Sequence, residues 1–126
     1  MVSQIEMWYC GIMIIQIVEN TISLEELREI AKEYYIDMVK GVVDISNEKV
    51  AFGGEYHMDA NVKILENGSN QADVWGFNLY VNQPAGNRVE FTSLINIRPH
   101  VGNKSMEVQD EGIRTRMQDI IERKIS

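Results

Sequence analysis

Short apolar segments recur along this chain between stretches with helical spacing, and their order limits the fold more than any other feature. Five segments are predicted to be strands: residues 12–18, 38–46, 49–57, 74–82 and 88–98. Three are predicted to be helices: residues 23–34, 59–67 and 110–125. Strands joined by short turns form antiparallel hairpins, and helices bury their apolar stripes against a sheet. The order β-α-β-β-α-β-β-α therefore predicts an α+β fold, with a mainly antiparallel sheet and helices packed on one face.

Each predicted helix has a start or stop signal. Ser23 and Glu26 form a capping box, in which the hydroxyl and the carboxylate accept hydrogen bonds from free backbone amides. Asp59 is a predicted N-cap of the second helix, and Gly68 is its left-handed stop. Asp110 is the predicted cap of the last helix, whose apolar stripe should lie in the core. This stripe consists of Ile113, Met117, Ile120, Ile121 and Ile125.

The first strand pair is predicted to turn at residues 47–48. This register pairs Val43 with Phe52 and collects apolar side chains on one face of the hairpin. It also places Lys40 opposite Glu55, where the two side chains would form a cross-strand ion pair.

The second strand pair is predicted to turn at residues 83–87, with Leu79 opposite Phe91. The apolar side chains of this hairpin again share one face. The other face carries polar side chains: Asn78, Tyr80, Glu90, Thr92, Asn96 and Arg98. A polar pocket is therefore expected on the sheet face opposite the helices.

The charge of the chain narrows its range of partners. Its 126 residues include 12 basic and 19 acidic side chains, which give a net charge of −7. Neither half of the chain is basic, and this disfavours binding to nucleic acid or to an anionic membrane surface. The length predicts one domain over residues 13–126, preceded by an N-terminal extension over residues 1–12 whose order the sequence leaves open.

Cysteine content and hydropathy indicate a cytoplasmic location. The chain has one cysteine, Cys10, so an intramolecular disulfide cannot form. The most apolar run, residues 7–18, is too short to span a bilayer and lacks the features of a signal peptide.

Glu55, His57 and Asp59 are candidate ligands for a divalent metal. If the strand that begins at Val50 continued through them, alternation would place all three side chains on one face. Carboxylate and imidazole groups suit Zn, Mn or Fe(II). The alternative is structural: an ion pair for Glu55, a hydrogen bond for His57 and a helix cap for Asp59.

Arg98 is the candidate anchor for a small anionic ligand. A guanidinium group binds carboxylate or phosphate with two parallel hydrogen bonds, and the loop that follows Arg98 is rich in glycine and asparagine. Asn96, Asn78, His57 and Asn103 are the side chains expected to orient such a ligand. The alternative is that Arg98 and Asn96 brace the loop by bonding to its carbonyl groups.

Several motifs resemble a family of small bacterial and archaeal proteins that is catalogued only as a domain of unknown function. These motifs are EYHMDA at 55–60, LENGSNQADVWGFNLY at 65–80, INIRP at 95–99 with Gly102, Asn103 and Ser105, and ISLEEL at 22–27. The resemblance covers residues 13 to 125, and members of the family begin near Met13. It implies no activity, but it marks positions for testing: Glu55, His57, Asn78, Asn96, Arg98 and Asn103. The chain departs from the family pattern at Asn61, Thr92, Met106 and Glu107.

Three functions follow as hypotheses. The first is a module that binds a small molecule or anion in a polar pocket on one sheet face. The second is a metal-dependent, hydrolase-like enzyme that uses Glu55 and His57. The third is a structural or interaction domain, in which the strand at 88–98 pairs between two subunits of a homodimer.

Overall fold

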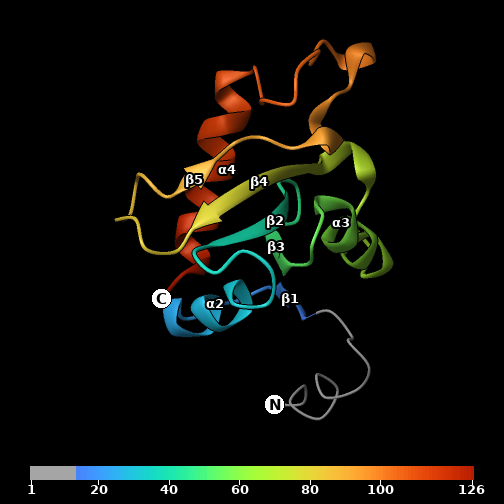
Figure 1. Ribbon diagram of the computed structural model, residues 1–126. Helices are drawn as coiled ribbons and strands as arrows, with labels where there is room; N and C mark the ends of the chain where they lie inside the picture. Colours follow the sequence, from blue (N-terminus) through green and yellow to red (C-terminus); the bar gives the residue numbers. More distant parts are fainter. Residues whose placement is uncertain (1–13) are drawn as a thin grey trace.

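The computed structural model describes residues 14–126, and within them it has the predicted order of elements (Figure 1). The five strands are β1 (Ile15–Val18), β2 (Met38–Asp44), β3 (Lys49–Gly53), β4 (Val74–Tyr80) and β5 (Val89–Glu90). The α-helices are α2 (Leu24–Ala31), α3 (His57–Glu66) and α4 (Glu111–Lys124). The α+β class is confirmed, whereas the predicted extension over residues 1–12 lies outside the described residues.

The strands form one five-stranded sheet in the order β1-β3-β2-β4-β5, and every neighbouring pair is antiparallel. The two hairpins are joined through β2 and β4, which pair along seven residues from Met38 opposite Tyr80 to Asp44 opposite Val74. The first and last strands in this order, β1 and β5, are the edges of the sheet.

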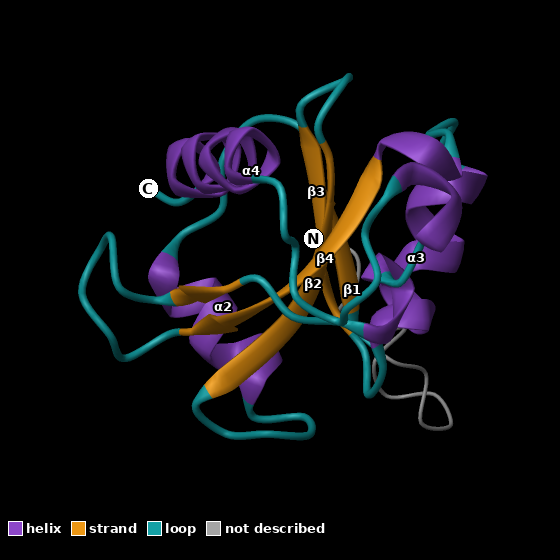
Figure 2. Cartoon of the chain, turned by 90° about the horizontal axis from the view of Figure 1, so that it is seen from above, coloured by secondary structure: helices purple, strands orange, loops and turns teal. Residues whose placement is uncertain are grey.

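Helices cover both faces of the sheet, which corrects the expectation that all of them pack on one face. The helices α2 and α4 lie on one side, and α3 lies on the other (Figure 2). The first face holds the larger core, in which Leu27 of α2 and Met117 of α4 pack with Phe77 of β4. On the second face, Ile64 of α3 packs with Val42 in a smaller apolar cluster.

The sequence has apolar residues at consecutive positions of the central strands because both faces of these strands are covered. In β2, Val42 belongs to the cluster under α3, and Val43 belongs to the core under α2 and α4. A helix covers only part of the second face, so its remaining area can carry polar side chains.

The predicted helix caps of α2 and α4 are confirmed. Ser23 Oγ accepts from Glu26 N at 3.1 Å, and Ser23 N donates to Glu26 Oε1 at 3.1 Å. Asp110 Oδ1 accepts from Ile113 N at 3.0 Å. No helix within residues 14–126 has both the length and the apolar content needed to cross a lipid bilayer.

The first hairpin differs from the predicted register by two residues. Val43 lies opposite Val50 rather than Phe52, and the strands are joined by residues 45–48. The Asp44 carboxylate accepts hydrogen bonds from the backbone amides of Ser46 and Asn47, each at 3.0 Å, and this holds the chain in a longer turn. A shift of two residues keeps each side chain on its predicted face. The strand β3 ends at Gly53, before Glu55.

The second hairpin is much shorter than predicted, because β5 contains only Val89 and Glu90. Its register is also shifted by two residues, so that Leu79 lies opposite Val89. After β5 the chain leaves the sheet and forms two 3₁₀ turns, at Leu94–Asn96 and Pro99–Val101, on its way to α4. Side chains rather than a backbone ladder attach this segment to β4, as shown below.

Candidate functional site

Three side chains lie next to one another across the part of the sheet that α3 leaves open. Asn78 of β4 is opposite Lys40 of β2 on one side and opposite Glu90 of β5 on the other. We call these three residues the polar row. Directly opposite residues of neighbouring strands point to the same face, so the row is a consequence of strand alternation. Tyr80 extends it, because its hydroxyl donates to Glu90 Oε1 at 2.9 Å.

His57 borders the polar row from the first position of α3. Its imidazole is buried, and Nε2 donates to the carbonyl oxygen of Phe77 at 2.8 Å. Because a carbonyl oxygen only accepts, the proton of the neutral ring is on Nε2. Burial lowers the pKa of His57 to about 4, although the bond to Phe77 acts in the opposite direction. The ring is therefore neutral at physiological pH.

Asn78 is the least satisfied member of the polar row. Its side-chain Nδ2 donates to Glu90 Oε1 at 2.9 Å, and the residue is only 8% exposed. A side-chain hydrogen bond with Asn78 would favour the charged imidazole, and it raises the pKa of His57. The neutral ring carries its one proton on Nε2, which bonds to Phe77, so it has no second N–H to donate. The Asn78 Oδ1 atom is buried and accepts no hydrogen bond from any residue in 14–126. A buried acceptor without a donor is uncommon, because it loses its interaction with water and gains nothing in return.

Lys40 places a positive charge beside this acceptor. Burial lowers the pKa of its ammonium group, and the nearby Glu90 carboxylate partly offsets this effect. Its Nζ lies 5.2 Å from the centre of the Tyr35 ring. None of the ion pairs found among residues 14–126 includes Lys40. The ammonium group is held near the row without a carboxylate in direct contact.

The strand face on which the metal prediction depended does not exist. The chain turns at Gly53 and Gly54, which both have positive φ, and α3 begins at His57. Asp59 does act at the helix start, but from the third helical position: its Oδ2 accepts from Glu55 N at 3.0 Å and from Tyr56 N at 2.9 Å. Nowhere in residues 14–126 do three or more histidine, cysteine, aspartate or glutamate side chains come together as metal ligands.

Arg98 lies in a second polar region, at the opposite end of β4. It is 7% exposed, and its guanidinium group donates to the carbonyl oxygens of Ile95, Ala72 and Val74. The group also lies over the Trp75 ring, with Cζ 4.3 Å from the ring centre. Burial lowers the pKa of Arg98. These contacts match the bracing role, and anion binding by Arg98 remains a prediction.

Asn96 and Asn103 complete this second region, and with Arg98 they form what we call the bracing network. Asn96 Oδ1 accepts from Gly76 N at 2.8 Å, and its Nδ2 donates to Gly76 O at 3.1 Å and Met106 O at 3.1 Å. This amide takes the place of a neighbouring strand beyond the end of β5. Asn103 Nδ2 donates to three backbone carbonyl oxygens of the same segment, those of Asn96, Ser105 and Glu107.

Gly76 allows this close attachment. A Cβ atom at this position would lie 2.5 Å from Ser93 Cβ and 2.6 Å from Ser93 Oγ. The glycine in the Trp-Gly-Phe-Asn stretch of β4 is therefore needed for the packing of the segment that follows β5.

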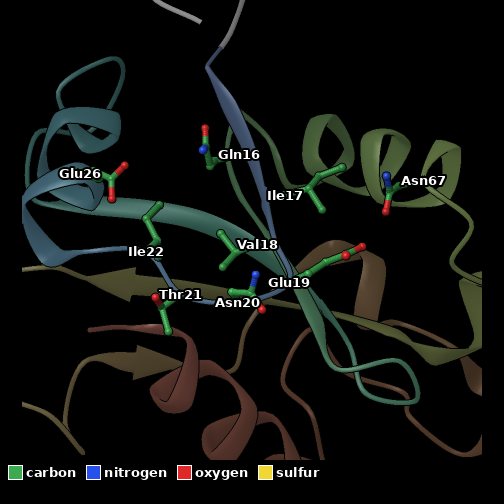
Figure 3. A pocket seen from close by; sticks show the side chains of 9 residues that line it. All are labelled: Gln16, Ile17, Val18, Glu19, Asn20, Thr21, Ile22, Glu26 and Asn67. Carbon is green, nitrogen blue, oxygen red and sulfur yellow. The ribbon is translucent and has the colours of Figure 1, made fainter. Parts of the chain in front are cut away.

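Two hollows formed by residues 14–126 are large enough for a small ligand, and the polar row lines neither of them; Lys40 lines a third hollow, which has almost no accessible volume. The larger, with a volume of about 470 Å³, follows β1 and the residues after it (Figure 3). It is lined by Gln16, Ile17, Val18, Glu19, Asn20, Thr21, Ile22, Glu26 and Asn67. The smaller, about 380 Å³, is lined by Met58, Gln71, Ala72, Ile95, Arg98 and His100. The larger hollow could not be expected from the sequence, because the sequence leaves the order of the strands in the sheet open.

The predicted ligand-binding residues thus separate into two groups. His57 and Asn78 lie together at the polar row, and Asn96, Arg98 and Asn103 lie together in the bracing network. Sequence reasoning treated Lys40 as an ion-pair partner of Glu55 and so missed its place in the row. The alternation of β2 against β4 could have identified Lys40 once the strand order was known.

Comparisons with known proteins agree with the resemblance, seen in the sequence motifs, to a family of unknown function. The family model described as a protein of unknown function, DUF5674, matches residues 16–124. No curated protein and no solved structure matches the chain. The family match covers every helix and strand of the sheet domain except Ile15, the first residue of β1, and the chain belongs to the DUF5674 family of proteins of unknown function.

Proposed function

We propose that this protein is a binding module for a small polar molecule, and that the polar row beside His57 is its binding site. The observation that carries the proposal is the Asn78 Oδ1 atom, a buried acceptor without a donor in the described part of the chain. Folded proteins satisfy most buried polar groups, and each exception calls for a physical explanation, such as strain, a functional role or a bound water, ion or ligand. A ligand that donates a hydrogen bond to this atom would remove the cost of burying it.

The neighbours of Asn78 define the chemistry of the ligand. Lys40 favours a negatively charged group, because no carboxylate within residues 14–126 forms an ion pair with its ammonium group. Asn78 Oδ1 requires an N–H or O–H donor a few ångströms from that group. A small carboxylate or phosphate compound that also carries an amine or hydroxyl group meets both requirements. This is the anionic class expected from the sequence, with Lys40 in place of Arg98 as its anchor.

The enzyme hypothesis has less support. A metal-dependent hydrolase needs ligands that converge, whereas Glu55 is exposed, His57 bonds to Phe77, and Asp59 caps α3. A neutral His57 with a pKa of about 4 is also a weak base. Binding requires only that the donors and acceptors of the polar row be held in place, and the sheet does this.

The proposal is tested by screening small amino acids, hydroxy acids and sugar phosphates for an increase in melting temperature. A ligand at a hundredfold excess over its Kd should raise the free energy of unfolding by about 3 kcal/mol. We expect Lys40→Gln to abolish this stabilisation. The matched control is Lys104→Gln, which removes the same charge from an exposed loop outside the row. No stabilisation of the wild-type protein, or equal loss in both variants, would contradict the proposal.

A further inference from the structure

The outer edge of β1 differs from the other sheet edge in its length and in the groove beside it. Among residues 14–126, β1 pairs only with β3, in an uninterrupted register from Ile15 opposite Gly53 to Val18 opposite Val50. The groove of about 470 Å³ follows its free side. Figure 3 shows β1 running between Glu26 of α2 and Asn67, which follows α3. The free edge is thus the floor of a groove that has an element on each side.

The groove has defined ends. At one end, Ile14 N donates to Glu33 Oε1 at 3.0 Å. At the other end, Ile22 N donates to Lys124 O at 2.7 Å, and Ser126 N donates to Ile22 O at 2.9 Å. Residues 15–21 lie between these points, and an added strand advances about 3.3 Å per residue. The open edge therefore suits an extended segment of about six residues.

Natural edge strands are protected by a very short length, by lysine, by proline, by a bulge or by a covering element. Within residues 14–126, the β1 edge has the first of these features, since β1 has four residues, but not the others. The sequence of β1 is Ile-Gln-Ile-Val, which contains no charge and no proline, and its register with β3 contains no bulge. An antiparallel edge strand directs the N–H and C=O groups of every second residue outward, where a further strand can pair with them.

Charge indicates the kind of segment that fits. Among the described residues that line the groove, the ionised side chains are Glu19 and Glu26. Two lysines approach the lining residues, but both are buried and bonded to backbone oxygens: Lys124 Nζ to Glu19 O at 2.6 Å, and Lys49 Nζ to Asn67 O at 2.9 Å. With a net charge of −7 over the chain, the groove favours a basic partner over an acidic one and over a second copy of this protein.

We propose that the β1 edge binds an extended basic peptide segment, which pairs with β1 as a sixth strand and places lysine or arginine near Glu19 and Glu26. This interaction is independent of the polar row, because the two sites share no residue. Backbone hydrogen bonds to β1 would supply affinity, and the two carboxylates would select for charge.

The test uses the full chain and three blocked hexapeptides. The first alternates lysine and valine, the second alternates glutamate and valine, and the third is the lysine peptide with every backbone nitrogen methylated, so that neither of its edges can donate to β1. NMR shifts and slowed amide exchange should appear at residues 15–20 with the lysine peptide and with neither of the others. Equal binding of the glutamate or methylated peptide, shifts confined to other elements, or no binding of the lysine peptide would overturn the proposal.

Matched variants distinguish the contribution of the two groove carboxylates from that of backbone pairing with β1. Glu19→Gln combined with Glu26→Gln should weaken binding of the lysine peptide by about threefold to tenfold, since each exposed ion pair contributes modestly. Glutamine at position 26 can still accept the hydrogen bond from Ser23 N. The control, Glu25→Gln with Glu107→Gln, changes the net charge equally outside the groove and should leave binding unchanged. Equal weakening in both double variants would overturn the charge assignment.

Other occupants of the groove give distinct results. Protection of the β1 amides that increases with protein concentration, together with a dimer in sedimentation, would identify a second copy as the occupant and overturn the proposal. Protection in dilute protein without peptide would mean that the chain already covers this edge, and it would also overturn the proposal.

Discussion

The bracing network and the polar row are built from similar polar side chains, and both involve β4, but they satisfy the hydrogen bonds of those side chains to different degrees. In the bracing network, the amide of Asn96 makes three hydrogen bonds, and Arg98 bonds to three carbonyl oxygens. In the polar row, the side chain of Asn78 makes one hydrogen bond, from Nδ2 to Glu90. Its buried Oδ1 accepts no hydrogen bond within residues 14–126.

This difference separates a structural polar group from a candidate binding group. A buried polar side chain whose partners are all present stabilises one conformation of the backbone. A buried polar side chain that lacks a hydrogen-bond partner lowers the stability of the fold and leaves a hydrogen bond available to a ligand. The type of residue does not distinguish the two cases, but the number of partners does. Each prediction below tests whether the two regions differ in this way.

The largest effect is expected for Asn96→Ala, which should lower the free energy of unfolding by about 4 kcal/mol. The substitution leaves Gly76 N, Gly76 O and Met106 O without their side-chain partner, and Asn96 is fully buried. Chemical denaturation measures the change. Asn87→Ala, in the exposed turn between β4 and β5, is the control and should change stability by less than about 0.5 kcal/mol. A similar small change for Asn96→Ala would mean that the network is not structural.

The second effect is a loss of stability at low pH because of His57. The folded pKa of about 4 lies below the ordinary value of 6.5. Between these values the unfolded chain binds a proton at this site and the folded chain does not, so stability is lost as the pH falls from 6.5 to 4. The loss is about 3 kcal/mol for this shift. Denaturation at a series of pH values measures it.

His57→Gln should remove most of that loss, because glutamine does not titrate and its amide can still donate to the Phe77 carbonyl. His100→Gln, at an exposed position, is the matched control and should retain the wild-type pH dependence. If both variants behave like the wild-type protein, the imidazole is not buried in its neutral form.

The third effect concerns Arg98→Lys, which should lower stability by about 2 kcal/mol. Lysine keeps the charge, but a single ammonium group cannot bond to several carbonyl groups while stacking on Trp75. Denaturation and a phosphate titration of the same variant decide between bracing and anion binding. Unchanged stability with loss of phosphate binding would instead support Arg98 as the anchor of an anion site.

The sequence predicted the order of elements and the N-caps of α2 and α4 because these depend on local patterns, whereas Asp59 lies at the third helical position of α3 and not at its N-cap. Ser23 with Glu26, and Asp110, mark helix starts through contacts within one turn. The register of the first hairpin was wrong by two residues because Asp44 accepts two amide hydrogen bonds and lengthens its turn, an alternative that side-chain alternation alone does not exclude. The strand predicted at 88–98 ends at Glu90 because the side chain of Asn96, rather than a backbone ladder, completes the edge at Gly76.

The candidate site was predicted only in part, because strand alternation is a local pattern, whereas the pairing of strands from different hairpins is not. Alternation placed Asn78, Tyr80 and Glu90 on one face, and these residues do lie together. Lys40 joins them only through the pairing of β2 with β4, which lie on different hairpins, and the sequence leaves their order open. His57 reaches the row from the start of a helix rather than from a strand.

The smallest effect, and the one that most directly compares the two regions, is expected for Asn78→Leu. This change removes the unsatisfied Oδ1 and keeps a side chain of similar size, while Tyr80 still bonds to Glu90. Stability should change by less than about 1 kcal/mol, because replacing a poorly satisfied polar group with an apolar one is nearly neutral. Asn96→Leu is the matched control and should destabilise the protein strongly. Denaturation of both variants, followed by the ligand screen on Asn78→Leu, tests stability and binding separately. Loss of binding without loss of stability would place the function at Asn78, whereas a large destabilisation would show that Asn78, like Asn96, is a structural residue.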